Sequence, residues 1–201
     1  MEGFLLPEIA NLIEKISVGL QLIYLFLLIK ENIWCWIFGI VGSLLGVLIF
    51  LNVNLYSESI LYGIYVLIGI YGWYTWANDD KEEEFIISRW TIKNIAISIF
   101  VGIGLASLLG YFFYKNTDAN NPFVDSHTTV FSLIASYMQA HKILSNWIFW
   151  IIINGVSVGL YWVRGLDFYG WLMVIYFISS FIGLYEWNRR YHLQSNEVSI
   201  S

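Results

Sequence analysis

The stretch NWIFWIIINGVSVGLY, from Asn146 to Tyr161, decides the fold class of this chain. Read as a helix, it places four side chains on one face, at positions i, i+4, i+7 and i+11: Trp150, Asn154, Ser157 and Tyr161. The opposite face carries isoleucine, valine and phenylalanine. A polar side chain in hydrocarbon needs a partner, so we expect this stripe to face a neighbouring helix or a water-filled cavity.

Composition indicates the same setting for the whole chain. Of its 201 residues 58% are hydrophobic and only 12% are charged, whereas a soluble domain is about 25% charged. This predicts an integral membrane protein. The acidic pI of about 5.1 and the lack of a basic patch argue against nucleic acid as a partner. The single cysteine, Cys35, allows no disulfide framework, and the acidic start predicts no cleaved signal peptide.

Seven apolar segments follow one another, and each is close to the ~20 residues that a membrane-spanning helix needs. Their length and the absence of ten-residue alternation favour helices over strands. Between them we expect a solvated charged loop, NDDKEEEFIISR (78–89), and a polar loop, KNTDANNPFVDS (115–126); the tail after Trp187 should fray. The segments are 9–29, 33–51, 57–77, 92–113, 127–142, 146–163 and 167–187.

The distribution of basic residues predicts the orientation. With seven spans, one side of the membrane holds seven lysines and arginines and the other holds three. Because the cytoplasmic side carries the excess, the N-terminus is expected outside and the C-terminus inside the cell.

An internal repeat is the strongest structural signal. Sliding the sequence by 114 positions without a gap aligns landmarks across two consecutive segments. The aligned pairs are Asn32 with Asn146, Trp36 with Trp150, Ile37 with Ile151, Ser43 with Ser157, Tyr62 with Tyr176, Gly69 with Gly183, Tyr71 with Tyr185 and Trp73 with Trp187. This predicts two parallel three-helix repeats joined by one linker helix, which is a transporter architecture with the substrate site between the repeats.

The repeat divides the chain into four parts. Residues 1–78 form the first repeat, 79–124 the charged loop and linker helix, 125–190 the second repeat, and 191–201 a polar tail. The third segment carries Glu58, Tyr62 and Tyr65 on one face, and the fifth carries Thr128 with Ser132 and Gln139. If such faces converge, they line a cavity of aromatic rings and uncharged polar groups, which suits a small ring-bearing polar molecule.

Each of these residues also has a structural interpretation. Tryptophans near segment ends are most often interfacial belt residues, and glycines such as Gly69 and Gly183 permit close helix packing. Glu58 could simply be solvated. Asn154 is different, because an unpaired amide at mid-membrane depth costs several kcal/mol. The seventh segment has no lysine that could form a retinal Schiff base, the histidines lack metal spacing and the chain has no GxSxG, so we expect no enzyme, cofactor or metal.

Three stretches together resemble one family. WCWIFGIVGS, LYSESILYGIYVLIGIYGWYTW and the run from Asn146 to Trp187 resemble the PnuC nicotinamide riboside transporters, over roughly 32–76 and 125–187. The resemblance implies a seven-helix, SWEET-like 3+1+3 fold and a homotrimer in the inner membrane. It also implies facilitated diffusion of an unphosphorylated vitamin precursor, trapped inside the cell by a kinase.

Two departures from the family leave the cargo open. This chain has Asn154 where relatives often have aspartate, and Leu61-Tyr62 where they often have Leu-Gln. Relatives carry thiamine, riboflavin or nucleosides. We therefore hold three hypotheses: a carrier of nicotinamide riboside, a carrier of thiamine on the same fold, and a membrane receptor or scaffold that transports nothing.

The first hypothesis gives the candidate residues their roles. Trp36 and Trp150 would stack on the nicotinamide ring, while Asn154, Ser157 and Thr128 would bond the ribose or carboxamide. Under the 114-residue shift Asn154 aligns with Ile40, so it is the first choice for the residue that selects the ligand. The remaining wall residues are Tyr62, Tyr65, Tyr161 and Tyr176, with Glu58 adding attraction for a cation from outside.

Overall fold

The computed structural model describes residues 5–52, 56–78, 86–117, 121–163 and 167–198; the side chains of 56–58, 161, 167–169 and 195–198 lie outside that description. All the helices that it describes are α-helices, and its only β-type contact is one isolated bridge between Ser88 and Ile143. The helices are α1 (Pro7–Ile29), α2 (Cys35–Asn52), α3 (Tyr56–Ala77), α4 (Ile92–Asn116), α5 (Pro122–Ala140), α6 (Asn146–Val163) and α7 (Asp167–Val198).

Five of these helices are long and apolar enough to cross a membrane, judged over the described residues. They are α1 to α4 and the Gly170–Gln194 part of α7, while α6 offers the shorter apolar stretch Asn146–Leu160. The prediction of an all-helical membrane protein with seven helices is therefore confirmed.

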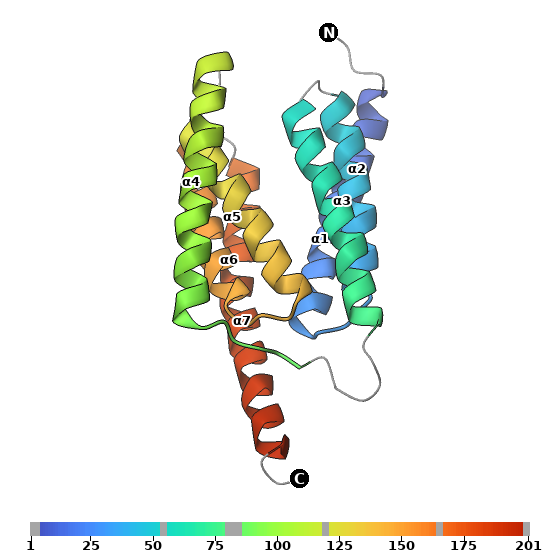
Figure 1. Cartoon of the computed structure of the whole chain (residues 1–201). Helices are drawn as coiled ribbons and strands as arrows, with labels where there is room; N and C mark the ends of the chain where they lie inside the picture. The colour runs from blue at the N-terminus through green and yellow to red at the C-terminus, as the bar shows by residue number, and fades with distance from the viewer. Residues whose placement is uncertain (1–4, 53–55, 79–85, 118–120, 164–166, 199–201) are drawn as a thin grey trace. The chain divides into compact units, whose positions relative to one another are not determined.

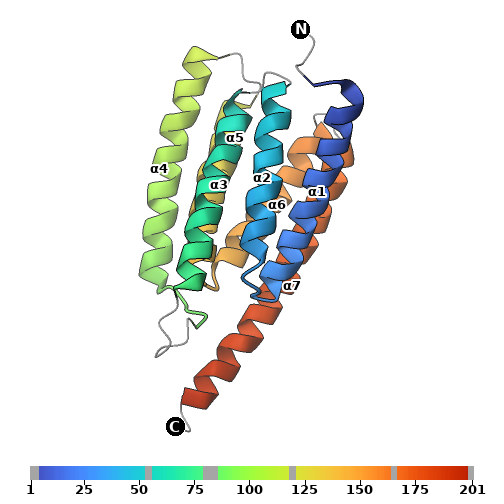
Figure 2. The same ribbon diagram turned by 90° about the vertical axis from the view of Figure 1, so that its right-hand side faces the viewer.

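Two helices differ most from their predicted bounds. α5 begins at Pro122, inside the run expected as a polar loop, because proline has no N–H to lose at the first helical position. α7 continues to Val198 (Figure 2), so the prediction that the chain frays after Trp187 is wrong. Gln194 explains the extension, because its Oε1 accepts a hydrogen bond from the backbone N–H of Ile87, at 3.2 Å.

The second half of the predicted charged loop is anchored by hydrogen bonds, although Ile86, Ser88 and Arg89 are exposed to solvent as expected. Ser88 donates its N–H to the carbonyl of Lys142 at 3.1 Å and accepts from Leu144 N at 2.9 Å. Arg89 donates to Asn188 on α7 and lies over the ring of Tyr191 on the same helix. The first half of that loop, residues 79–85, lies outside the described residues.

The chain divides into two compact units, residues 1–85 and 86–201. In the first unit α2 packs against both α1 and α3, and the three helices run side by side (Figure 1). Glycines bring them close: a Cβ on Gly72 would lie 2.5 Å from the ring of Trp36, and one on Gly46 would lie 2.2 Å from Tyr62. Small residues thus create the hollows into which the aromatic rings of α2 and α3 fit.

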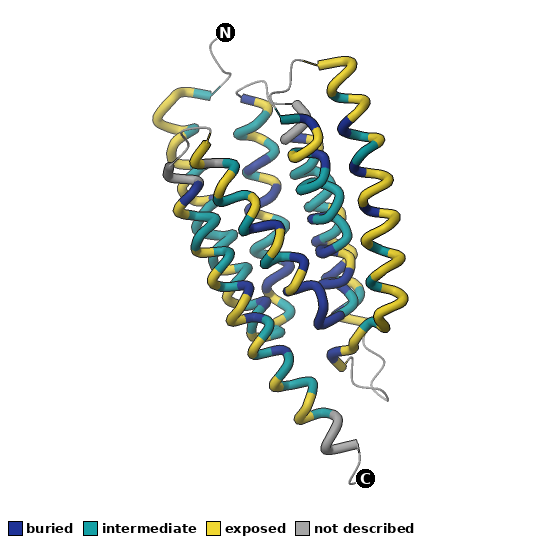
Figure 3. Tube along the Cα trace, turned by 90° about the vertical axis from the view of Figure 1, so that its left-hand side faces the viewer, coloured by how far each residue is buried: buried dark blue, intermediate teal, exposed yellow. Residues whose placement is uncertain are grey.

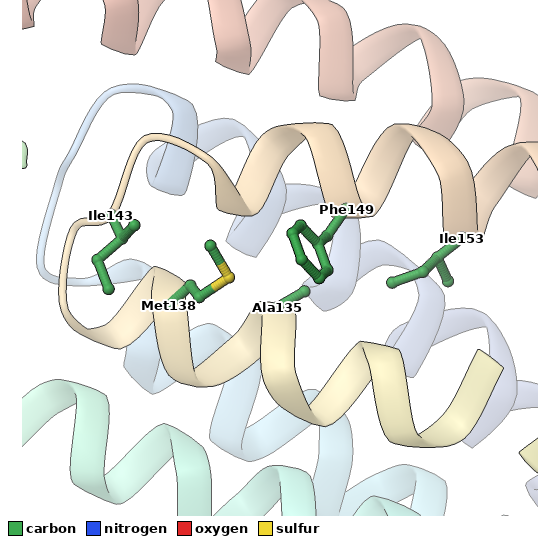
Figure 4. Close-up of a cluster of buried hydrophobic side chains, with 5 residues drawn as sticks. All are labelled: Ala135, Met138, Ile143, Phe149 and Ile153. Carbon is green, nitrogen blue, oxygen red and sulfur yellow. The ribbon is translucent and has the colours of Figure 1, made fainter. Parts of the chain in front are cut away.

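In the second unit α5 packs against α4 and α6, and α6 packs against α7. α4 meets α5 through three buried small residues at i, i+4 and i+8, Gly102, Ala106 and Gly110. Figure 3 shows the buried bands of α4 on an otherwise largely exposed helix. Between α5 and α6 lies a buried hydrophobic cluster (Figure 4), made of Ala135, Met138, Ile143, Phe149 and Ile153.

The corner between α1 and α2 has the same backbone geometry as the corner between α5 and α6. Glu31 and Lys142 both have positive φ, 54° and 48°. Asn32 N donates to Leu27 O at 2.9 Å, and Ile143 N donates to Met138 O at 2.8 Å. Each residue of the second corner is 111 positions beyond its counterpart in the first, since 31 + 111 = 142 and 32 + 111 = 143.

The same spacing holds for the tryptophans. Trp36 meets Trp76 edge to face at 5.5 Å and 89°, and Trp147 meets Trp187 at 5.5 Å and 87°. Trp36 packs on Gly72 as Trp147 packs on Gly183. The predicted 114-residue alignment is therefore wrong in register by three residues. A slip of three is nearly one helical turn, which keeps each landmark on nearly the same face and made the false alignment convincing.

The corrected register changes which residues are equivalent. Trp36 corresponds to Trp147 and not to Trp150, whose counterpart is Gly39. Asn154 corresponds to Ser43 and not to Ile40, since 43 + 111 = 154. The predicted symmetry of Trp36 and Trp150 is accordingly withdrawn.

Candidate functional site

The polar stripe of α6 finds partners on two neighbouring helices. Trp150 turns toward α5, where its Nε1 donates to the Oε1 of Gln139 at 3.0 Å. Gln139 is fully buried, whereas Trp150 is half-buried. A hydrogen bond that Trp150 donates to a buried amide oxygen thus orients a ring that packing leaves partly open. Asn154, one turn further along the stripe, turns toward α7.

Asn154 is the buried centre of the second contact. It is 8% exposed, and its Nδ2 donates to the Oγ of Ser180 at 3.1 Å. Ser180, 1% exposed, donates in turn to the backbone carbonyl of Tyr176 at 2.8 Å. The requirement that a buried amide be paired is met here by a serine hydroxyl. We call Gln139, Trp150, Asn154 and Ser180 the α6 polar cluster.

The other candidates in the second unit are less engaged with one another. The hydroxyl of Thr128 donates to the carbonyl of Asp125 at 2.9 Å and to that of Val124 at 3.2 Å, so its own helix uses it. Ser157 and Tyr176 are half-buried. The side chain of Tyr161 lies outside the described residues.

The candidates in the first unit are aromatic packing residues. Trp36 is 2% exposed and lies against Trp76, Tyr24 and Gly72. Tyr62 and Tyr65 are half-buried and meet edge to face at 5.9 Å. Since the ring of Trp36 is already surrounded, it has no free face for a ligand. Glu58 belongs to α3, but its side chain is outside the described part of the chain.

Two members of the α6 polar cluster were missed as site residues. Gln139 was noticed on the polar stripe of the fifth segment but was not selected. Helical spacing places both Ser179 and Ser180 close to the face of Tyr176, so the sequence alone does not single out Ser180. The signal that could have identified Gln139 and Ser180 is that each is a polar residue in a neighbouring segment, at about the same membrane depth as Trp150 or Asn154.

Charge is absent from the buried parts of the described helices. No lysine or arginine that the structure describes is buried; Lys142 and Arg190 are half-buried and the others are exposed. The described residues also contain no group of histidine, cysteine, aspartate or glutamate that could hold a metal ion. His141, at the end of α5, has its pKa lowered by burial from the ordinary value of 6.5.

The fold and composition define a multi-span helical membrane protein whose second unit buries uncharged polar groups. Residues 11–189 match the sequence profile of a family described as nicotinamide mononucleotide transporter, and the chain belongs to that family. The resemblance to PnuC proteins is thereby confirmed.

Individual relatives agree with this assignment. The chain is 26% identical to the nicotinamide riboside transporter PnuC of Escherichia coli K12, over 86% of this chain and 82% of that protein. It is 24% identical to the riboflavin/roseoflavin transporter RibM of Streptomyces davaonensis, over 89% of this chain and 85% of that protein. The crystal structure of the vitamin B3 transporter PnuC superposes with a TM-score of 0.75 at 17% identity, covering 90% of this chain and 83% of the other. The last similarity establishes the shared fold.

Proposed function

We propose that this protein carries nicotinamide riboside across the cell membrane by facilitated diffusion. The observation that carries the proposal is the family match over residues 11–189, together with the E. coli relative that transports this molecule. A cytoplasmic kinase that phosphorylates the riboside would trap it inside the cell and keep the inward gradient. The transporter itself then needs no catalytic residues.

The absence of buried cations in the described helices supports an unphosphorylated cargo. A phosphate monoester carries about −1.5 to −2 charges at pH 7 and is normally neutralised by arginine or lysine. Every described lysine and arginine is exposed or half-buried. We therefore favour the riboside over the mononucleotide, although the family description names the mononucleotide.

Trp150 is the ring that we assign to stacking on the substrate. It is half-buried and oriented by Gln139, whereas Trp36 is already enclosed by other rings. The nicotinamide ring of the riboside is a cation, and each aromatic face attracts such a cation by ~0.5–2 kcal/mol. Asn154 and Ser157 would form hydrogen bonds with the ribose or the carboxamide. Thr128 would contribute only if its hydroxyl gave up its hydrogen bonds to the backbone carbonyls of its own helix. The tyrosines Tyr62, Tyr65, Tyr161 and Tyr176 would complete the wall, and Glu58 would attract the cation.

Riboflavin is the second candidate cargo, favoured by the similarity to the Streptomyces flavin transporter. Its ring system is neutral, so it would stack on Trp150 but gain no cation–π attraction. Thiamine, a cation with an aromatic ring, remains a competitor on chemical grounds alone.

We further propose a SWEET-like arrangement of two parallel three-helix repeats, α1–α3 and α5–α7, with α4 as the linker. The matching corners and the matching tryptophan pairs, 111 residues apart, support it. The divisions 1–78, 79–124, 125–190 and 191–201 follow from it. Rocking of the two repeats would alternate access to the substrate, with the N-terminus outside, the C-terminus inside and three copies forming a trimer.

Uptake into proteoliposomes tests the proposal. Purified protein should admit labelled nicotinamide riboside down its gradient without a proton or sodium gradient, and unlabelled riboside should compete better than its mononucleotide, thiamine or riboflavin. Uptake that requires an ion gradient would contradict facilitated diffusion. Competition dominated by riboflavin would reassign the cargo, and binding without uptake would favour the receptor hypothesis.

A further inference from the structure

We infer that Ser180 is a positioning residue that fixes the amide of Asn154 so that its carbonyl oxygen accepts a hydrogen bond from the substrate. The inference rests on the proposed function. It predicts a specific selectivity: the site prefers a carboxamide on the pyridine ring over a carboxylate. Nicotinamide riboside should therefore be bound, and nicotinic acid riboside should be rejected.

The orientation of the amide follows from the hydrogen bonds of Ser180. A serine hydroxyl has one proton, and Ser180 donates it to the backbone carbonyl of Tyr176, one turn earlier on α7. The Oγ can then only accept, so the group of Asn154 that faces it must be the NH₂. Turning the amide over would place two oxygens together or cost the bond to Tyr176. Two hydrogen bonds are kept in one orientation and only one in the other.

This orientation leaves the carbonyl oxygen of Asn154 available. Among the residues that the structure describes, none donates a hydrogen bond to Asn154 Oδ1. Asn154 as a residue is only 8% exposed. The described side-chain atoms that are fully buried without a partner are Trp36 Nε1, Ser126 Oγ, Asn146 Oδ1 and Trp147 Nε1, so Asn154 Oδ1 keeps some accessible surface that a ligand can reach. On the same face of α6, one turn away, lies Trp150, the ring assigned to stacking.

The available edge of the Asn154 amide matches a carboxamide. A carboxamide NH₂ can donate to Oδ1, and its carbonyl can accept the second N–H of Nδ2. A carboxylate could accept that N–H, but its other oxygen would then face Oδ1 with no proton between them. An unpaired buried acceptor costs enough to reduce binding by about tenfold or more.

Affinities of the two ribosides test this inference on the full-length protein in detergent or nanodiscs. The wild type should bind nicotinamide riboside more than about tenfold more tightly than nicotinic acid riboside. In Ser180→Ala the amide is free to turn over and offer its NH₂, so the ratio should fall to within about threefold. Ser180→Thr retains a hydroxyl that bonds the same carbonyl and should restore the ratio.

The ratio separates positioning from structural support, because a general loss of stability lowers both affinities together. Ser98→Ala is the matched control: the hydroxyl of Ser98 on α4 also bonds a carbonyl of its own helix, that of Ile95, at 2.8 Å. It should leave the ratio unchanged. Asn154→Asp, which offers only acceptors, should keep or increase the preference for the carboxamide.

The outcomes distinguish the inference from the function on which it rests. Equal affinity of the wild type for both ribosides, or an unchanged ratio in Ser180→Ala, would overturn the role of Ser180 and leave riboside transport standing. Failure of the wild type to bind either riboside, with tight binding of riboflavin, would overturn the proposed cargo and the inference together.

Discussion

The two units share a scaffold and differ in where they place their large rings. At one equivalent pair of positions, the first unit has Tyr24 on α1 and Gly39 on α2, and a Cβ on Gly39 would lie 2.9 Å from the tyrosine ring. The second unit has Ala135 on α5 and Trp150 on α6, and Trp150 packs against the cluster that contains Ala135. The large residue of the pair is thus on the first helix in the first unit and on the middle helix in the second unit. At this pair of positions the middle helix carries a ring only in the second unit.

The polar contacts at equivalent positions also differ between the two units. Ser43 in the first unit accepts a long hydrogen bond from Gln21, at 3.4 Å. Its counterpart Asn154 instead reaches the third helix of its unit, at Ser180. The counterpart of Ser180 is Gly69, which has no side chain to offer. The tryptophan–glycine contacts are common to both units and pack their helices together. The residues peculiar to the second unit are those to which we propose to assign recognition.

The strongest expected effect is loss of either scaffold tryptophan. Trp36→Ala and Trp147→Ala should each destabilise the protein by about 3–5 kcal/mol, because both rings are fully buried. Thermal unfolding of purified protein measures this. Trp150→Ala is the matched comparison: it should reduce riboside affinity about tenfold or more with a smaller loss of stability. A similar profile for Trp147 and Trp150 would break the distinction between scaffold and recognition.

Adding a methyl group to the glycines beneath Trp36 and Trp147 should destabilise the protein somewhat less than removing these tryptophans. Gly72→Ala and Gly183→Ala each place a methyl group 2.5 Å from an indole ring, which should destabilise the protein by about 1–3 kcal/mol. Gly159→Ala on α6 is the control, since nothing described lies within 4 Å of its added Cβ, and it should be neutral or slightly stabilising. Unequal losses at Gly72 and Gly183 would contradict the equivalence of the two contacts.

Removing the support of Trp150 should affect recognition more than folding. Gln139→Met deletes the acceptor at 3.0 Å from the indole N–H while conserving volume. We expect riboside affinity to fall roughly three- to tenfold, because a hydrogen bond contributes about 0.5–1.5 kcal/mol. In a Trp150→Phe background the same change should have no further effect on affinity. An additive loss in the double variant would show that Gln139 acts independently of Trp150.

The smallest effect concerns pH. Burial lowers the pKa of His141 below 6.5, so the folded protein disfavours the charged form more than the unfolded chain does. Stability from this group is present above pH 6.5 and is lost as the pH falls through and below that value. His141→Gln should flatten that part of the stability profile, measured by thermal unfolding between pH 5 and 8. Lys30→Gln, at the equivalent corner position of the first unit, should leave the slope unchanged.

Much of the fold was predictable because hydrophobic runs of membrane-spanning length report helices directly. The helix ends were less so, since Pro122 looked like a loop residue and could equally begin a helix. The extension of α7 was unpredictable from local sequence, because Gln194 and Asn188 are held by residues about 100 positions away. The 114-residue alignment was wrong in register, since a slip of three residues is nearly one helical turn and leaves each landmark on nearly the same face.

The candidate site was predictable only in part. A buried amide demands a partner, which singled out Asn154, but the identity of that partner depends on how α6 and α7 align along their lengths. Ser179 and Ser180 are adjacent, and only the packed helices distinguish them. Trp36 and Trp150 look alike in sequence, and burial alone assigns one to packing and the other to the stripe.

Uptake of labelled nicotinamide riboside into proteoliposomes containing wild-type protein or Asn154→Leu tests the central claim most directly. The wild type should equilibrate the riboside without an ion gradient, and Asn154→Leu, which cannot hydrogen-bond the substrate, should show an apparent affinity roughly tenfold or more weaker in protein that is still folded. Equal uptake by the two proteins would contradict the assignment of substrate recognition to the α6 polar cluster.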